Sequence, residues 1–206
     1  MNAVTAILLA AGQSIRFGAG NKLLVEIEGE TMVRRVATAL CASRADRLVV
    51  VLGHETEQVA AALSGLPLET VVNPNFGDGQ VTSVRVGVGA VSDDASGFMM
   101  CLADQPHLAA ADYDVLIDAF ADQADRIVVP YVAGKRGNPV ILPITLRDGI
   151  LAGGVNVGCR QFIDAHPERV RRLDVSNPHY RNDFDTPQAF AVNTDEDGIG
   201  QTRRTN

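Results

Sequence analysis

A loop near the start of the chain combines small residues with two cations, a combination suited to binding phosphate. It follows an apolar run over residues 4–9, and it contains three glycines as well as Arg16 and Lys22. Glycines let backbone N–H groups approach an anion closely, and successive N–H groups form a concavity that holds phosphate oxygens. Arginine and lysine can then neutralise the charge of a polyphosphate. We therefore predict a nucleoside triphosphate loop, the alternative being an ordinary solvated strand-to-helix connection.

Two better-known phosphate loops are excluded by the spacing of these residues. A P-loop requires the pattern G-x-x-x-x-G-K-[ST], whereas Lys22 follows Asn21 and precedes Leu23. A dinucleotide fingerprint requires G-x-G-x-x-G, and Leu23 stands where the third glycine would follow Gly18 and Gly20. The loop is therefore of another kind.

Carboxylates follow two later segments and could hold a metal ion. Asp104 comes directly after an apolar run over residues 98–102. Mg²⁺ binds one or two carboxylates together with phosphate oxygens, so a carboxylate at a strand end beside a polyphosphate loop favours a metal site. Its alternative is an Asp that caps the next helix. Asp183 and Asp185 bracket Phe184 and could add a second carboxylate, but Asp185 could equally cap a last helix; both interpretations stay open.

Two further segments have the composition of ligand-binding turns. Gly79 precedes a predicted helix that has Thr82 and Ser83 in its first turn. A helix N-terminus with hydroxyl groups can bind a phosphate or a sugar, although ordinary capping is nearly as good an explanation. Residues 137–139 could present a backbone edge to a second substrate, but their spacing alone favours a hairpin turn.

Strands and helices alternate over the first 130 residues, which predicts an α/β fold with one doubly wound, mostly parallel, Rossmann-like sheet. The continuous apolar run over residues 4–9 indicates a parallel strand that is covered on both faces. We expect residues 131–143 to form a hairpin-like excursion. Further strands are expected at 48–52, 68–72, 98–102, 126–130 and 170–175, and helices at 32–43, 56–63, 81–91, 109–124, 145–151, 158–166 and 185–190.

The segments that could carry chemistry all follow predicted strands. They are the opening loop, the turn over residues 73–79 and the turn at Asp104. Ligands bind outside the carboxyl ends of the strands in such sheets, so we expect these segments to share one edge. The 206 residues suit a single domain, with a core over residues 4–193 and a polar tail over 194–206.

Composition narrows the classes of partner. A net charge of -7 argues against broad nucleic-acid binding, but it allows one nucleotide in a locally basic pocket. Cys41, Cys101 and Cys159 have no metal-ligand spacing and indicate reduced thiols in a cytoplasmic protein. We expect Cys101 in the core. No apolar run approaches the length of a membrane span.

Together these segments resemble the MobA/MocA-type nucleotidyltransferases, a branch of the fold family that includes sugar-phosphate nucleotidylyltransferases. The resemblance runs in order over residues 4–190, and it implies a fold of the nucleotide-diphospho-sugar transferase type. The segments that carry it are residues 9–18 with 21–24, 73–74 with 79 and 83–85, 102–106, 136–139 and 183–187.

The resemblance implies a role for each matched residue. Arg16, Lys22 and Asp104 would be catalytic, with both cations on the triphosphate. Asp104 would bind Mg²⁺ (or Mn²⁺), with Asp185 as a second ligand. The residues implied for nucleotide binding are Leu9, Ala10, Ala11, Gly12, Asn73, Gly79 and Ser83. Those implied for the acceptor are Gly137, Asn138, Pro139 and Asn156.

The implied activity is transfer of CMP from CTP to a phosphorylated acceptor, the pterin of the molybdenum cofactor, with release of pyrophosphate. The Ala10-Ala11 pair is similar to the cytidylyltransferase subgroup, because guanylyltransferase relatives tend to have glycine at the second position. The sequence departs from the family at Val155-Asn156, where many relatives have Gly-Asp, and at Gln80, where methionine is frequent.

Three alternatives accompany this prediction. The acceptor could be a sugar or polyol phosphate, or the donor could be GTP, as in the molybdopterin guanylyltransferases. From another class, the chain could be a nucleotide- or cofactor-binding chaperone module without turnover. A molybdoenzyme or its chaperone would be the protein partner that the resemblance implies.

Overall fold

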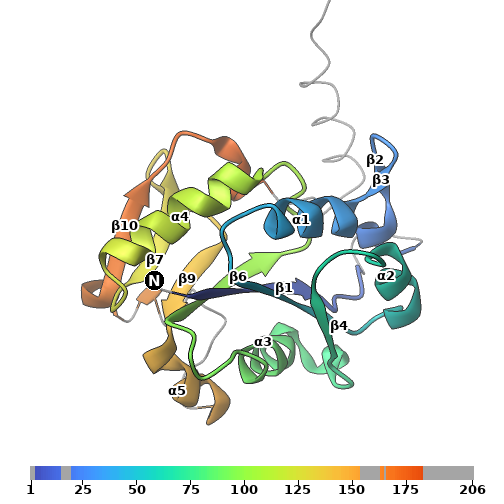
Figure 1. Cartoon of the computed structure of the whole chain (residues 1–206), viewed down its shortest axis with the longest axis horizontal. Coiled ribbons are helices and arrows are strands. Elements are labelled where there is room, and N and C mark those ends of the chain that lie inside the picture. The colour runs from blue at the N-terminus through green and yellow to red at the C-terminus, as the bar shows by residue number, and fades with distance from the viewer. Residues whose placement is uncertain (1–2, 15–19, 154–162, 165, 183–206) are drawn as a thin grey trace, which may run out of the picture.

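The computed structural model describes residues 3–14, 20–153, 163–164 and 166–182. Its centre is a sheet with strand order β10-β7-β9-β6-β1-β4-β5 (Figure 1). The strands are β1 Val4–Ala10, β4 Arg47–Leu52, β5 Glu69–Val72, β6 Gly97–Leu102, β7 Ile127–Val132, β9 Val140–Pro143 and β10 Val170–Asp174. Four of their pairings are parallel: β1–β4, β1–β6, β4–β5 and β7–β10. The predicted mostly parallel α/β sheet is confirmed.

Several predictions fall on parts of the chain outside the described residues. These are the roles of Arg16, Asn156, Asp183 and Asp185, and the last expected helix at residues 185–190. Most of the helix expected at 158–166 lies outside as well. The prediction of a single domain with a polar tail from residue 194 stays a prediction.

Strand β1 lies between β4 and β6, and its register brings their carboxyl ends together. Leu8 pairs with Val50 of β4 and with Cys101 of β6. Because both neighbours are parallel to β1, the chain leaves all three strands at one edge of the sheet. The opening loop and the Asp104 turn therefore begin side by side.

The segment over residues 131–143 is only in part an excursion. Strand β8, Lys135–Arg136, turns back on β7 as an antiparallel hairpin, as predicted. The apolar run that follows is β9, however, and it enters the main sheet between β6 and β7, antiparallel to both. Its four residues are all buried, and a continuous apolar run fits a strand covered on both faces.

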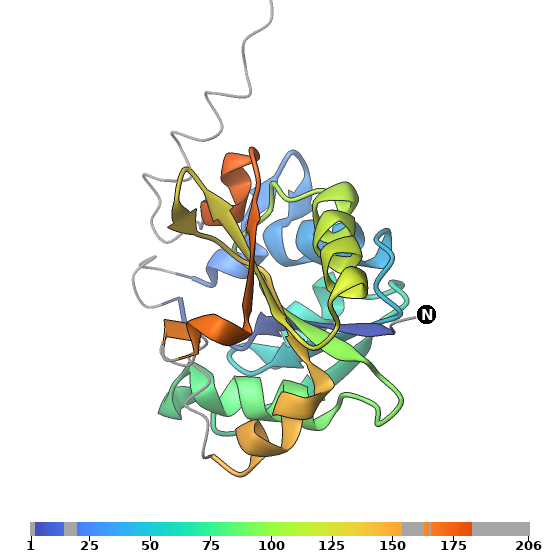
Figure 2. The same cartoon turned by 90° about the vertical axis from the view of Figure 1, so that its left-hand side faces the viewer.

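Helices cover both faces of the sheet. On one face lie α1 Met32–Cys41, α2 Thr56–Ala62 and α4 Ala110–Asp122, and on the other α3 Gln80–Gly89 and α5 Arg147–Leu151 (Figures 1 and 2). The 3-10 turns are η2 Lys22–Leu24, η3 Phe76–Asp78, η4 Ile144–Leu146, η5 Pro167–Arg169 and η6 Pro178–Arg181. A small hairpin, β2 Glu26–Ile27 with β3 Glu30–Thr31, precedes α1.

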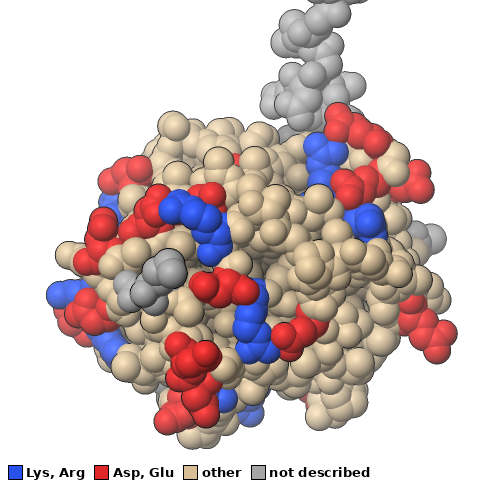
Figure 3. Space-filling view, in the orientation of Figure 1, with Lys and Arg blue, Asp and Glu red and all other residues tan. Residues whose placement is uncertain are grey.

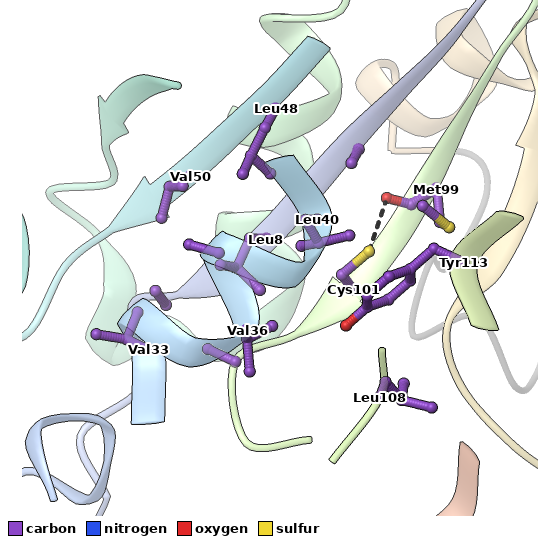
Figure 4. Packing of buried hydrophobic residues seen from close by; sticks show 14 of the residues in the cluster. Leu8, Val33, Val36, Leu40, Leu48, Val50, Met99, Cys101, Leu108 and Tyr113 are labelled. Atoms are coloured by element: carbon purple, nitrogen blue, oxygen red, sulfur yellow. Dashed lines mark hydrogen bonds between the residues drawn. The ribbon is translucent and has the colours of Figure 1, made fainter. Parts of the chain in front are cut away.

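The larger core lies under α1 and α4. Leu8 of β1 packs with Val36 and Leu40 of α1, and Cys101 lies beside Tyr113 of α4 (Figure 4). Cys101 is 1% exposed, so its predicted place in the core is confirmed. Burial raises the pKa of its thiol well above the usual value, because a thiolate would lose its hydration there. This cysteine therefore stays a neutral packing residue.

Helix α3 lies close to the sheet because of Gly87. A Cβ at Gly87 would overlap Cγ2 of Ile7 and would lie 2.9 Å from Cγ2 of Val51. We expect Gly87→Ala to lower the free energy of unfolding by about 1–3 kcal/mol, as overpacking does. Gly89→Ala on the same helix is the control, since its Cβ would meet Leu151 at 3.9 Å. Urea unfolding of both variants checks this; equal stability would contradict the close packing.

The surface mixes charges of both signs. Acidic and basic side chains lie next to one another over the face in Figure 3. Several form ion pairs, among them Arg44 with Asp118 and Arg47 with Glu69, each at 2.7 Å. In the described part of the chain, no helix combines the length and the apolar character that crossing a membrane requires.

Candidate active site

A pocket of about 460 Å³ opens at the carboxyl edge of the central strands. Its lining comes from the opening loop, from η2, from the turn that contains η3, from the start of α3 and from the end of β6 with its turn. The lining thus brings together three segments that are far apart in the sequence, residues 9–23, 76–83 and 102–104, as expected from the strand–turn pattern. The volume falls in the range of pockets that hold small-molecule ligands.

Most of the predicted site residues that the structure describes come together in this pocket. The predicted residues that line it are Leu9, Ala11, Gly12, Lys22, Gly79, Ser83 and Asp104. Ala10 and Asn73 are buried and do not line the pocket, and residues 137–139 do not line it either.

The opening loop is held at both ends by specific contacts. Gly53, directly after β4, packs so closely that its Cβ would lie 2.7 Å from Cβ and 2.9 Å from the carbonyl oxygen of Ala11. At the other end, the Lys22 amide donates to Oγ of Ser14 at 3.2 Å, and Oδ1 of Asn21 accepts from the Leu23 amide at 3.0 Å. The loop ends are therefore fixed, and Lys22 begins η2 in a defined place.

Lys22 and Asp104 form an ion pair in the pocket. The Lys22 Nζ lies 2.6 Å from Oδ2 of Asp104, and the two side chains are 14% and 17% exposed. Partial burial strengthens such a pair relative to one in water, but each charge also loses hydration. The pairing brings a cation and an anion from positions 82 residues apart to one point.

Asp104 also has an unused oxygen. Its Oδ1 is buried and accepts no hydrogen bond from the described residues. A buried charged oxygen without a partner is costly, and a cation would satisfy it. No group of three metal-ligating side chains occurs among the described residues, so a Mg²⁺ or Mn²⁺ ion at Asp104 would need further ligands, and phosphate oxygens and water are ligands that Mg²⁺ accepts. The residues present fit such an ion.

Asp104 does not cap the helix that follows it. Helix α4 begins at Ala110, and the amide of Ala109 donates to Oδ2 of Asp112 at 2.9 Å. Asp112 therefore serves the start of this helix. Asp104 instead faces the pocket and Lys22.

Ala10 and Asn73 have structural positions that their predicted nucleotide-binding role did not anticipate. Ala10 is 1% exposed and belongs to the core cluster under α1. Side chains alternate between the two faces along a strand, so the next residue, Ala11, belongs to the cluster on the opposite face of the sheet. The Nδ2 of Asn73 donates to Oγ1 of Thr82 and to Oγ of Ser83, at 2.8 and 2.9 Å. Asn73 thus joins the end of β5 to the first turn of α3.

The predicted acceptor segment is seated against η6. The Asn138 amide donates to the Tyr180 carbonyl at 2.7 Å, and a Cβ at Gly137 would lie 2.6 Å from that same oxygen. Burial, together with the charge of Asp112, raises the pKa of the Tyr180 hydroxyl above its usual value. The hydroxyl therefore stays protonated and donates to the Asp112 carbonyl at 2.7 Å.

Some of the residues that line the pocket had no role assigned to them from the sequence. Phe76 lines the pocket and packs against the same cluster as Ala11, and Gln80 lines it from the first residue of α3. A lone aromatic residue in the otherwise polar turn 73–79 was the available signal for Phe76. The remaining unassigned lining residues are Gln13, Ser14, Leu23, Gly77, Leu102 and Ala103.

Known proteins are similar in sequence to most of this chain. The chain is 28% identical to nicotine blue oxidoreductase of Paenarthrobacter nicotinovorans, over 89% of this chain and 92% of that protein. It is 31% identical to a molybdenum cofactor guanylyltransferase of Rhodopseudomonas palustris, over 95% and 90%. It spans only about a third of the bifunctional GlmU proteins that it also matches, 37% of the one from Sorangium cellulosum.

Solved structures share the fold. The crystal structure of Rv0371c from Mycobacterium tuberculosis has a TM-score of 0.82 and 26% identity, covering 95% of this chain and 100% of that one. A manganese complex of Rv0371c has a TM-score of 0.77 and 24% identity, covering 92% and 97%. The family described as MobA-like NTP transferase domain matches residues 6–170. The chain belongs to this family and is a nucleotidyltransferase of the MobA-like type.

Proposed function

We propose that this protein transfers CMP from CTP to the phosphate of a molybdopterin-type acceptor. The observation that carries the proposal is the Lys22–Asp104 pair in the pocket that Gly12 and Ser14 also line. A cation for phosphate oxygens and a carboxylate with a free oxygen for a divalent ion are the two parts that a nucleoside triphosphate requires. The same pair is why we propose group transfer at phosphorus rather than the redox activity named for one relative.

In the proposed reaction, an oxygen of the acceptor phosphate attacks the α-phosphorus of CTP in line. The new P–O bond forms as the bond from the α-phosphorus to the bridging oxygen breaks, and pyrophosphate leaves with that electron pair. No nucleophile of the enzyme is needed, so catalysis consists of positioning and charge stabilisation.

Residues of this chain would divide these tasks between them. Lys22 would exchange its contact with Asp104 for the triphosphate and stabilise the departing charge. Gly12 is exposed, and nothing lies within 4 Å of where its Cβ would be, so phosphate could approach the backbone there. Asp104 would hold the divalent ion, with Asp185 as the proposed second ligand, and that ion would offset charge on the phosphate oxygens. The manganese complex of a solved relative supports metal use.

The choice of base rests on Ala11 and its surroundings. The Ala10-Ala11 pair of the cytidylyltransferase subgroup supports CTP. Ala11 and Phe76 together give the pocket an apolar wall, against which a base can pack. GTP is the second candidate, because relatives at about 31–32% identity are named molybdenum cofactor guanylyltransferases.

The donor and the acceptor are tested together by pyrophosphate release. Wild-type protein is assayed with CTP, GTP, ATP and UTP against molybdopterin and against sugar and polyol phosphates. We expect CTP with molybdopterin to give a kcat/KM at least about 10-fold above every other pair. If the protein preferred GTP, the proposed donor would be wrong. If it preferred a sugar phosphate, the proposed acceptor would be wrong.

A binding module without turnover is the remaining alternative. Tight CTP binding without pyrophosphate from any pair would favour it. We further propose that the product passes to a molybdoenzyme or its chaperone, and that the protein works in the cytoplasm; Cys41 and Cys101, both free thiols, support that compartment.

A further inference from the structure

Gln105, the residue after Asp104, is a buried amide that the proposed reaction does not yet use. It is 2% exposed. Its Nε2 donates to the Tyr180 carbonyl at 3.2 Å, while its Oε1 has no partner among the described residues. A buried amide is costly unless its hydrogen bonds are made, so a leucine would be the cheaper residue for packing alone. The amide therefore calls for a role beyond packing.

The Tyr180 carbonyl is a junction between two parts of the molecule. It accepts from Gln105 on the Asp104 side and from the Asn138 amide on the hairpin side. Gly137 packs against it so closely that any side chain would collide with it. Figure 2 lets the reader follow η6 and the chain after β8, which these contacts place side by side.

Tyr180 is itself held firmly from the other side. Its ring is 1% exposed, and its hydroxyl donates to the Asp112 carbonyl at 2.7 Å. Asn177, at the start of η6, donates through Nδ2 to Oδ1 of Asp112 at 2.9 Å. The carbonyl that Gln105 meets is thus fixed to α4 and cannot shift freely.

We propose that Gln105 is a positioning residue that sets the acceptor segment at residues 137–139 relative to Asp104. This inference rests on the proposed function, in which Asp104 holds the metal–triphosphate side and residues 137–139 meet the acceptor. The chain runs from the Asp104 carboxylate to Gln105, across one hydrogen bond to Tyr180, and across a second to Asn138. In-line attack depends on the separation of these two sides.

The test uses Gln105→Leu and Gln105→Glu in the whole 206-residue chain. Leucine removes the donor, and a glutamate carboxylate would face the Tyr180 carbonyl as a second acceptor. For Gln105→Leu we expect KM for the acceptor to rise about 10-fold while the dissociation constant of the nucleotide changes by less than about 2-fold. For Gln105→Glu we expect the acceptor KM to rise at least as much, because a glutamate offers the Tyr180 carbonyl no amide donor.

Ser43→Ala is the matched control for stability. It also removes a side-chain hydrogen bond to a carbonyl, that of Leu40 at 2.7 Å, but at the end of α1. The positioning role is wrong if Gln105→Leu loses nucleotide affinity and acceptor affinity to the same extent. It is also wrong if the acceptor KM and the nucleotide dissociation constant of Gln105→Leu equal those of Ser43→Ala. An acceptor KM for Gln105→Glu equal to that of wild type would contradict it as well.

Amide hydrogen exchange separates this inference from the proposed function. In Gln105→Leu we expect the Asn138 amide to exchange about 10-fold faster than in wild type, with unchanged exchange in β1. If wild-type protein released no pyrophosphate, the proposed function would fail, yet this measurement would still decide whether Gln105 orders the segment. Unchanged exchange at Asn138 would overturn the inference.

Discussion

Asp104→Asn is expected to lower the rate of pyrophosphate release by about 10³-fold. Asparagine keeps the size and shape of the side chain but removes the negative charge that would hold the divalent ion. The nucleotide would then meet Lys22 without the ion that offsets charge on its phosphates. The measurement is kcat for CTP with molybdopterin at saturating Mg²⁺, followed by a Mn²⁺ titration of each protein by electron paramagnetic resonance.

Two controls accompany this variant. Asp78→Asn removes a carboxylate from an exposed residue of η3 between the lining residues Gly77 and Gly79, and we expect kcat to change by less than about 3-fold. Asp104→Asn also removes the carboxylate charge that lies 2.6 Å from the largely buried Lys22 ammonium, and breaking such a pair can cost roughly 3 kcal/mol. The double variant Asp104→Asn with Lys22→Gln removes that cost; recovery of stability without activity is the expected result. Activity of Asp104→Asn within 10-fold of wild type would show that Asp104 does not hold the ion.

Lys22→Ala is expected to lower kcat/KM for the nucleotide by about 10²–10³-fold. Among the residues that the structure describes, Lys22 is the cation that lines the pocket. Removing it takes away the charge that would stabilise the triphosphate and the departing pyrophosphate. Lys22→Met is the companion variant, because it keeps the aliphatic stem and removes only the charge. Initial rates over a range of CTP concentrations measure the effect.

Lys135→Ala is the matched control for Lys22. These are the only two lysines in the sequence, and Lys135 is exposed in β8. Its removal should leave kcat/KM within about 3-fold of wild type. If Lys22→Met retained wild-type turnover, the role of Lys22 would be wrong, and Arg16 would be left to carry the triphosphate alone.

The edge of the sheet that carries the pocket could be predicted from the sequence for a simple reason. A parallel strand must leave the sheet at its carboxyl end, so Gly12, Gly79 and Asp104 had to meet once the strands were recognised. The apolar runs that give those strands are continuous, because both faces of the sheet are covered.

Other features depend on contacts that no local pattern encodes. The entry of β9 into the main sheet is one, since a four-residue apolar run does not reveal which strands it joins. The pairing of Lys22 with Asp104 is another, because the two residues are 82 positions apart. The bonds from Asn73 to Thr82 and Ser83 likewise appear only when β5 and α3 are placed in space.

Ala10 and Ala11 are adjacent in the sequence but lie in different surroundings. Adjacent residues of a strand point to opposite faces, so one of the two alanines enters the core under α1 and the other lines the pocket. The resemblance assigned both to the nucleotide. The structure separates the two alanines: Ala10 is buried in the core, and Ala11 lines the pocket.

Transfer of the α-phosphate is the most direct test of nucleotidyl transfer in this pocket. Wild-type protein is incubated with molybdopterin, Mg²⁺ and CTP that is radiolabelled either at the α- or at the γ-phosphate. Nucleotidyl transfer predicts that the α-label appears in the acceptor product and the γ-label in pyrophosphate, with both reactions about 10³-fold slower in Asp104→Asn. The γ-label in the acceptor, or bound CTP with no movement of either label, would contradict it.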